Sequence, residues 1–146
     1  MTPVIDVTTG TVPAPVGIDT GAVLPTTASR PSLMTPFPLV RIRGRLTTGG
    51  ARITLLTVRA PTGAHLAVRC IGRSCARRSW ARATKLTRLS RFETRLKAGT
   101  RLEIRITRAG MIGKFTAITI RRGAPPLRRD RCLVPGRSAP TRCPGR

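Results

Sequence analysis

From residue 38 onward, apolar and polar side chains alternate in short runs, which is typical of β-strands that bury one face. In the first run, aliphatic residues or glycine alternate with arginine. A glycine-rich turn and a second apolar run follow, so residues 39–60 predict a β-hairpin. An interruption of the alternation predicts a β-bulge near Leu55 and Leu56.

Three further segments show the same alternation. Residues 65–70 form the first of them and end in a cysteine. Residues 101–107 and 115–121 are the other two, and a glycine-containing turn joins them. Each of these segments predicts a strand with aliphatic side chains on one face and mostly polar side chains on the other.

The intervening residues 76–99 show no clear period and contain many arginines. Here we expect a loop to residue 83 and a short strand at residues 84–89. A helical turn then follows, with Ser90 as its cap and Glu93 three residues further on, in the pattern of a capping box. This turn is expected to end at Gly99.

Together these runs predict six or seven short strands separated by turns, and hence an all-β fold, an immunoglobulin-like β-sandwich. Residues 37–123 form this predicted sandwich. The Thr- and Pro-rich residues 1–36 predict a flexible tail or linker, because repeated proline interrupts helices and central strands. Residues 124–146 predict an irregular, cysteine-clamped extension packed on the sandwich.

Charge changes this picture. The chain has 28 Lys and Arg against 5 Asp and Glu, a formal net charge of +23. Only one of these bases lies within residues 1–36, so the predicted sandwich is a polycation that attracts polyanions and opposes its own compaction. High-GC codon usage is the preferred explanation for the excess of arginine over lysine. It does not explain the scarcity of acidic residues.

The same arginines provide the candidate site. Arg41, Arg43 and Arg45 on one strand and Arg101 and Arg105 on another would share an outward face if both strands belong to one sheet. An arginine-rich sheet surface can hold phosphates or carboxylates through paired hydrogen bonds. Its binding to polyanions would weaken steeply with salt. The alternative interpretation is a solvated face without a ligand.

The cysteines fall into two local pairs, Cys70 with Cys75 and Cys132 with Cys143. Of the three possible connectivities we favour these neighbouring disulfides. A zinc site is the alternative, but both spacers are longer than the spacer of about two residues in zinc ribbons. Disulfides indicate an extracellular or cell-envelope location. The N-terminus lacks a signal-peptide pattern, so we expect either a start upstream of Met1 or a cytosolic protein with reduced thiols, and favour the former.

The sequence offers little for catalysis. His65 is the single histidine, which excludes a histidine-rich metal site, and oxidised cysteines are not nucleophiles. The acidic residues of the domain are surrounded by arginine, as expected of ion-pair partners. The segment GMIGKF at residues 110–115 lacks the glycine spacing of a phosphate loop and predicts a turn. We therefore predict no enzyme activity, catalytic residue, metal or cofactor.

Two stretches carry a resemblance that covers about residues 36–146: PFPLVRIRGRLTTGGARITLLTVRAPTGAHLAVRCIGRSC and RLSRFETRLKAGTRLEIRITRAGMIGKFTAITIRRGAPPLRRDRCLVPG. They resemble uncharacterised exported proteins of high-GC actinobacteria related to Solirubrobacter. In such proteins a basic immunoglobulin- or fibronectin-like domain follows an exported N-terminal region. The resemblance thus implies a β-sandwich and export, and it implies no enzyme activity or ligand. The present chain differs in lacking the export signal.

These observations predict a non-catalytic extracellular module that binds an anionic cell-envelope polymer or lipid surface. No apolar run approaches the roughly 18–20 residues that span a bilayer, so no transmembrane segment is expected. The alternative is a basic nucleic-acid-binding protein, which the high charge also suits. Against it, the chain has no Tyr, few aromatic residues for base stacking and no recognition helix. The sequence does not indicate an oligomeric state.

Overall fold

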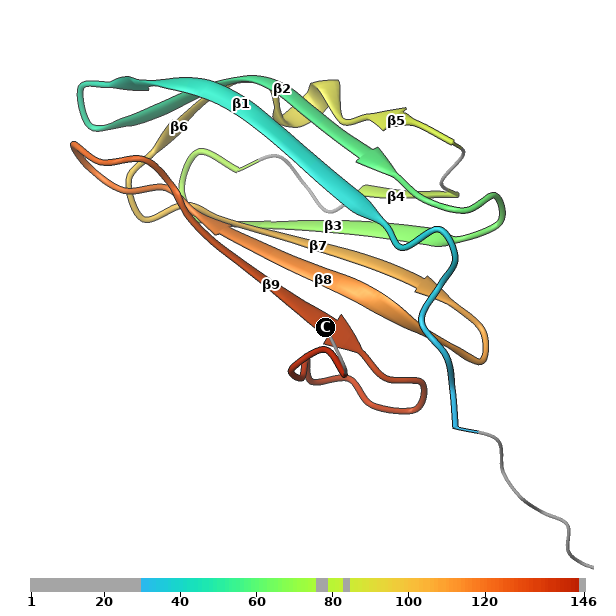
Figure 1. Ribbon diagram of the computed structural model, residues 1–146. Helices are drawn as coiled ribbons and strands as arrows, with labels where there is room; N and C mark the ends of the chain where they lie inside the picture. Colours follow the sequence, from blue (N-terminus) through green and yellow to red (C-terminus); the bar gives the residue numbers. More distant parts are fainter. Residues whose placement is uncertain (1–29, 76–78, 83–84, 145–146) are drawn as a thin grey trace, which may run out of the picture. The chain divides into compact units, whose positions relative to one another are not determined.

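Strands dominate residues 30–75, 79–82 and 85–144, which are the parts of the chain described by a computed structural model. Residues 79–82 are described by their backbone alone. The strands are, in chain order, β1 (Leu39–Thr47), β2 (Gly50–Arg59), β3 (His65–Ile71), β4 (Ser79–Arg82), β5 (Thr87–Arg88), β6 (Arg95–Lys97), β7 (Arg101–Arg108), β8 (Met111–Thr119) and β9 (Leu127–Leu133) (Figure 1).

The chain divides into two units, Met1–Arg30 and Pro31–Arg146, and all of these strands belong to the second unit. The predicted flexible tail lies, as far as residue 29, outside the described residues. The strands alone therefore define the fold that follows.

The N-terminal part of the second unit pairs with β8 before the predicted start of the sandwich at residue 37. The backbone N–H of Met34 donates to the Ile112 carbonyl at 3.1 Å, and the N–H of Ile112 donates to the Ser32 carbonyl at 2.8 Å. Met34 is buried. A pairing of this length is too short to leave a period in the sequence.

The strands form two antiparallel sheets. The first sheet has the order β1-β2-β5, and β6 also pairs with β2. The second sheet has the order β4-β3-β7-β8-β9. Figure 1 shows the two sheets as separate layers, one above the other. The prediction of an all-β fold is confirmed, and the layering is sandwich-like.

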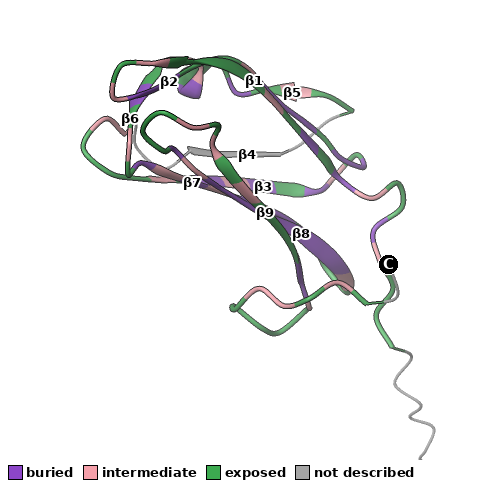
Figure 2. Cartoon of the chain, turned by 60° about the vertical axis from the view of Figure 1, so that its left-hand side comes forward, coloured by how far each residue is buried: buried purple, intermediate pink, exposed green. Residues whose placement is uncertain are grey.

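One apolar core lies between the sheets and draws on both of them. Leu102, Ile104 and Ile106 of β7 are fully buried, whereas the residues between them are partly exposed. Leu56 and Val58 of β2 are fully buried on the other side of the core (Figure 2). Each large aliphatic side chain removed from water stabilises the fold by about 1.5–3 kcal/mol. The alternation therefore identified the strands that build the core.

The hairpin predicted over residues 39–60 is confirmed as β1 and β2, and it contains a bulge close to the predicted place. The register shifts directly after the pair formed by Arg43 and Leu55. The next residue of β1 is Gly44, at which a Cβ would collide with the carbonyl oxygen of Arg52. The absence of a side chain at Gly44 thus permits the close approach of the two strands at the bulge.

The region without a clear period differs from its prediction. Residues 79–82, expected in a loop, form β4 at the edge of the second sheet, and the strand expected at residues 84–89 is reduced to β5. Residues 76–78 and 83–84 lie outside the described residues. Short strands at a sheet edge need few apolar side chains, which explains the missing period.

The expected helical turn is present as a single 3-10 turn, η2 (Ser90–Phe92). The predicted cap is wrong, because no side-chain hydrogen bond caps the turn. The chain then continues as β6, which pairs with β2, instead of remaining helical to Gly99. Phe92 is buried and anchors the turn to the core.

Strand β9 lies where the sequence predicted an irregular extension. It pairs with β8 from Gly113 to Thr119. The alternation is hidden in β9 because Arg128 and Asp130, which lie on the inner side of the strand, are polar. Only the following residues, up to the second disulfide, are irregular as expected.

Candidate anion-binding surface

The five arginines that were predicted to share one face lie on different sheets. Arg41, Arg43 and Arg45 belong to β1 of the first sheet, and Arg101 and Arg105 belong to β7 of the second. Because the sheets pack by their inner faces, their outer faces point away from each other. The structure therefore does not bring the five together. Alternation determines which face of a strand is charged, but not which sheet the strand joins.

On the first sheet, three arginines from three strands stand in one row. Arg45 of β1 is the register partner of Arg52 of β2, and Arg52 is in turn the partner of Arg95 of β6. All three residues are exposed. Register partners in an antiparallel pair have Cβ atoms about 4.5–5.5 Å apart. The three arginine side chains therefore project from the same face of the sheet and lie close together. We call these three residues the arginine row.

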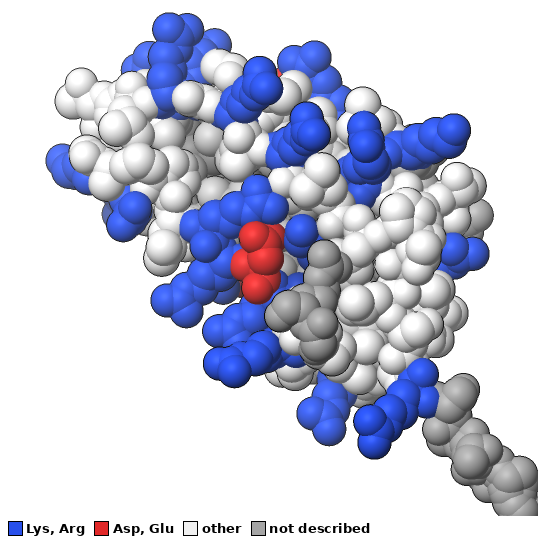
Figure 3. Space-filling view, viewed as in Figure 1, with Lys and Arg blue, Asp and Glu red and all other residues white. Residues whose placement is uncertain are grey.

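Among the described residues, no carboxylate compensates the arginine row. The ion pairs in this part of the chain involve four other bases, Arg88, Arg101, Lys114 and Arg128. Figure 3 shows basic side chains spread over one side of the molecule, with a small acidic patch among them. Like charges placed directly opposite each other destabilise a sheet. The row thus has an unfavourable electrostatic energy, which a bound anion would lower.

Glu93 follows η2 and is occupied by contacts within the protein. Its carboxylate accepts hydrogen bonds from Arg88 Nε at 2.9 and 3.0 Å and from the Leu56 backbone N–H at 2.9 Å. The hydrogen bond from Arg88 first, and then that from Leu56, hold the pKa of Glu93 below its ordinary value. The carboxylate therefore stays ionised and ties the turn to β2. It is an ion-pair partner, as the sequence predicted.

The two predicted arginines of the second sheet, Arg101 and Arg105, also make contacts within the protein. Arg101 Nε lies 2.9 Å from Glu103 Oε2. The guanidinium of Arg105 lies 5.0 Å from the centre of the Phe115 ring and donates from Nη1 to the Ser138 carbonyl at 2.9 Å. The hydrogen bond from Arg105 to Ser138 ties the C-terminal segment to the outer face of the sheet. Arg101 and Arg105 thus have structural partners that the arginine row lacks.

Two arginines of β9 extend the charge of this second face. Arg129 and Arg131 are the register partners of Ala117 and Phe115 on β8. Together with Arg101 they line a shallow hollow of about 450 Å³. Neither residue was predicted from the sequence, because the alternation did not reveal β9.

Two members of the arginine row, Arg52 and Arg95, were also not predicted. Arg52 carried a usable signal, because it lies between Ala51 and Ile53, both buried, in the predicted hairpin. Arg95 carried none, because it falls in the region without a period. Its place beside Arg52 depends on the pairing of β6 with β2, which local sequence does not reveal.

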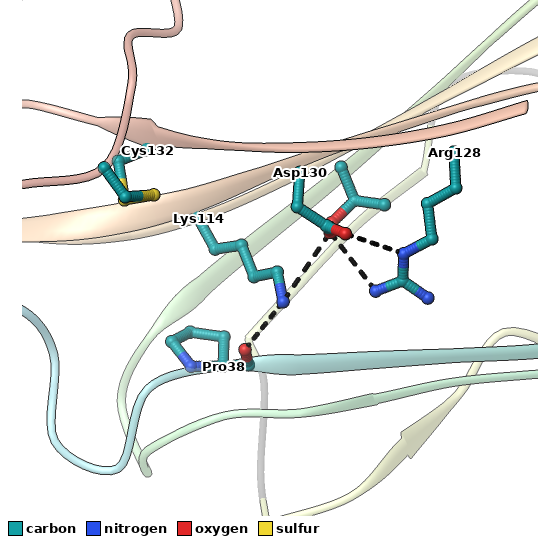
Figure 4. Close-up of polar contacts among 7 residues, drawn as sticks. Pro38, Lys114, Arg128, Asp130 and Cys132 are labelled. Atoms are coloured by element: carbon teal, nitrogen blue, oxygen red, sulfur yellow. Dashed lines mark hydrogen bonds and ion pairs between the residues drawn. A yellow bond between two sulfur atoms is a disulfide. The ribbon is translucent and has the colours of Figure 1, made fainter. Parts of the chain in front are cut away.

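A polar cluster occupies the inner side of the β8–β9 edge (Figure 4). The ammonium group of Lys114 donates to the Pro38 carbonyl at 3.2 Å and lies 3.6 Å from Asp130 Oδ1. Asp130 also accepts hydrogen bonds from Thr116 Oγ1 at 2.7 Å and from Arg128 Nε at 2.9 Å. Partial burial would raise the pKa of Asp130, but the hydrogen bonds from Arg128 and Thr116 outweigh it and lower this pKa. The cluster joins β8, β9 and the start of β1.

This cluster also decides the role of the GMIGKF segment. Only Gly110 of this segment lies in the turn between β7 and β8, whereas Met111–Phe115 already belong to β8, so the predicted turn is wrong for most of the segment and the strand starts earlier than residue 115. Lys114 is buried and is directed to the Pro38 carbonyl rather than toward a surface loop. The lysine is therefore a structural residue of the sandwich.

Both predicted cysteine pairs form disulfides. One joins Cys70 to Cys75 after β3, and the other joins Cys132 to Cys143. The favoured connectivity is thus confirmed. Two disulfides suit a non-reducing setting.

Other chemistry is sparse in the described part of the chain. His65 is exposed at the start of β3. No group of three or more His, Cys, Asp and Glu within the described residues could hold a metal ion. In that same part, no helix is both long and apolar enough to cross a membrane.

Comparison with protein-family models, curated proteins and solved structures finds no match for the chain.

Proposed function

We propose that the protein is a non-catalytic extracellular module that binds an anionic polymer or lipid surface of the cell envelope through the outer face of the first sheet. The arginine row carries this proposal. Its three side chains are exposed, opposed in register and without a carboxylate partner among the described residues. An extended anion with regularly spaced charges is the ligand that such a row fits.

The energetics favour a polymeric ligand. Three adjacent guanidinium groups repel one another, and each can hold a phosphate or carboxylate with paired hydrogen bonds. A ligand with one charge would satisfy a single arginine and leave the repulsion between the others. A polymer satisfies all three at once, and Arg41 and Arg43 on the same strand extend the track. A polymer that binds the folded state and not the unfolded state would also raise the free energy of unfolding.

The strand order supports an immunoglobulin-like sandwich. The first sheet, with β2 between β1 and the short strands β5 and β6, corresponds to strands A, B and E of that fold. In the second sheet, β3, β7 and β8 take the places of strands C, F and G, and β9 is an added edge strand. Domains of this kind are common on cell surfaces. The two disulfides and the exported proteins that the chain resembles agree with an extracellular location.

Two variants of equal charge test the proposal. The row variant carries Arg45→Gln, Arg52→Gln and Arg95→Gln. The matched control carries Arg69→Gln, Arg129→Gln and Arg131→Gln, which remove three exposed charges from the second sheet. Retention is measured on isolated cell-envelope material and on vesicles that contain anionic lipid, at about 0.15 M salt.

We expect the wild-type chain to be retained, the row variant to bind about tenfold or more weakly, and the control to change much less. Equal losses in the two variants would mean that only net charge matters and would refute the role of the row. Tighter retention on RNA or DNA than on envelope material at about 0.2 M salt would favour the nucleic-acid alternative.

A further inference from the structure

A hollow of about 580 Å³ lies at one end of the sandwich, where four connections between strands meet. The turn between β1 and β2 contributes Thr48 and Gly49. The loop after β3 contributes Gly72 and Arg73, residues 97–100 contribute one whole wall, and Arg122 enters from the segment after β8. The hollow is a product of the tertiary fold, since its walls are far apart in the sequence.

Residues 97–100 tie these connections together. The N–H of Ala98 donates to the Gly49 carbonyl at 2.8 Å, which fixes the β1–β2 turn. The N–H of Gly99 donates to the Ile120 carbonyl at 2.8 Å, which fixes the chain leaving β8. The positions of these two walls are therefore set before any ligand arrives.

The third wall is held by a disulfide and by one serine. Ser74 lies within the loop closed by the Cys70–Cys75 disulfide. Its hydroxyl accepts a hydrogen bond from the Lys97 N–H at 3.2 Å and lies 3.1 Å from Thr100 Oγ1, with which it shares a second hydrogen bond. Thr100 is buried. The loop that carries Arg73 is thus held in place by the disulfide and by the hydrogen bonds of Ser74.

The charges on the hollow all have one sign. Arg73, Lys97 and Arg122 line it, each from a different connection, and all three residues are exposed. The remaining described lining residues are Thr, Gly and Ala, so this part of the lining contains no carboxylate. None of the ion pairs found among the described residues involves these three bases. Small neutral neighbours leave the three cations open to a ligand of opposite charge.

We propose that this hollow binds a phosphate group. Two guanidinium groups and one ammonium group match the several oxygen atoms and the charge of phosphate. The absence of large apolar lining residues argues against an apolar ligand. The site rests on other residues than the arginine row, so it can exist whether or not the row binds a polymer. The phosphate can come from a free inorganic ion or from a phosphate-containing polymer.

Titration of the ¹⁵N-labelled protein, followed by amide chemical shifts, tests this site. Sodium phosphate is added at constant ionic strength, with sodium chloride as the balancing salt. We expect saturable shifts at Gly49, Gly72, Gly99 and Thr100, and no such response to chloride alone. A short glycerol-phosphate oligomer is titrated in parallel. Saturation by either compound supports the site, and the tighter of the two identifies the source of the phosphate.

Matched variants make the result specific. Arg73→Gln with Arg122→Gln is expected to weaken phosphate binding about tenfold or more, because each removes a charge-assisted hydrogen bond. Lys97→Gln is a second variant with the same expected direction. Arg129→Gln with Arg131→Gln removes as much charge elsewhere and is expected to leave binding unchanged.

Three results would overturn the proposal. The first is chemical shifts that rise linearly with phosphate concentration, and the second is an affinity for acetate equal to that for phosphate. The third is an unchanged phosphate affinity in both the Arg73→Gln, Arg122→Gln variant and the Lys97→Gln variant.

Discussion

On the outer face of the first sheet, arginine faces arginine across three strands, whereas on the outer face of the second sheet the two arginines of β7 face an acid and an aromatic ring. Arg101 is paired with Glu103, and Arg105 lies on Phe115 and bonds to the Ser138 carbonyl. The arginine row has no such partner among the described residues. The comparison teaches that the partner, rather than the number of arginines, separates a face that stabilises the fold from a face available to a ligand.

The strongest test of this contrast concerns stability. Phe115 lies on the outer side of β8 and is nevertheless buried. We expect Phe115→Ala to lower the free energy of unfolding by about 3–5 kcal/mol, because it leaves a cavity beneath Arg105 and the C-terminal segment. Arg52→Ala on the first sheet is expected to change it by no more than about 0.5 kcal/mol. Urea unfolding measures both, and similar values for the two variants would contradict the contrast.

The salt dependence of binding gives the next largest effect. Each phosphate neutralised contributes about 0.7–0.9 to the slope of log affinity against log salt concentration. If each arginine of the row contacts one phosphate of a polymer, the row variant should lose about two to three units of this slope. Binding of a phosphate-containing polymer, measured at several salt concentrations, checks this. A similar loss in the Arg69, Arg129 and Arg131 control would show that the two faces bind alike.

The pH dependence of stability tests the contribution of Asp130, whose carboxylate has partners within the fold. The pKa of Asp130 is lower in the folded state than its ordinary value, so its contribution to stability is present above about pH 4 and is lost as the pH falls through the folded value. We expect Asp130→Asn to lower the free energy of unfolding at neutral pH by up to about 1 kcal/mol, since the carboxylate is partly screened by solvent. The difference from the wild type should vanish in strong acid. A constant difference at all pH values would mean that charge is not its cause.

The smallest expected effect comes from placing an acid in the arginine row. Arg52→Glu would replace two repulsive neighbours by two attractive ones and should raise the free energy of unfolding by about 0.2–1 kcal/mol. It should weaken polymer binding at the same time. Arg129→Glu, whose register partner is Ala117, serves as the control. Thermal unfolding of both variants measures the difference, and a loss of stability in Arg52→Glu would argue against repulsion within the row.

Much of the fold follows from side-chain alternation, but only where the inward positions are aliphatic. The strands that supply Leu102 or Val58 were predicted for this reason. β9 was not, since Arg128 and Asp130 take inward positions that aliphatic residues usually hold. Asp130 is contacted by Lys114 and Thr116 on the neighbouring strand, and a local pattern carries no information about these contacts.

The candidate surface was predicted in part for a related reason. Arg45 was identified from the alternation in β1, and Arg52 could have been. Arg95 became its neighbour through long-range pairing of a three-residue strand in a region without a period. The assignment of Arg101 and Arg105 to the same surface failed because the order of strands in a sheet is a property of the whole chain.

Among the described strands, β1 is the edge of the first sheet and pairs with β2 alone. An open edge is a template on which another chain can add a strand, and charged side chains along it prevent such aggregation. Arg41, Arg43 and Arg45 supply this protection, since two copies approaching edge to edge would repel each other. A polyanion bound to these residues would cancel the repulsion. We therefore expect light scattering to show self-association of the protein at saturating polymer and little without it, so that the ligand itself controls whether the copies assemble.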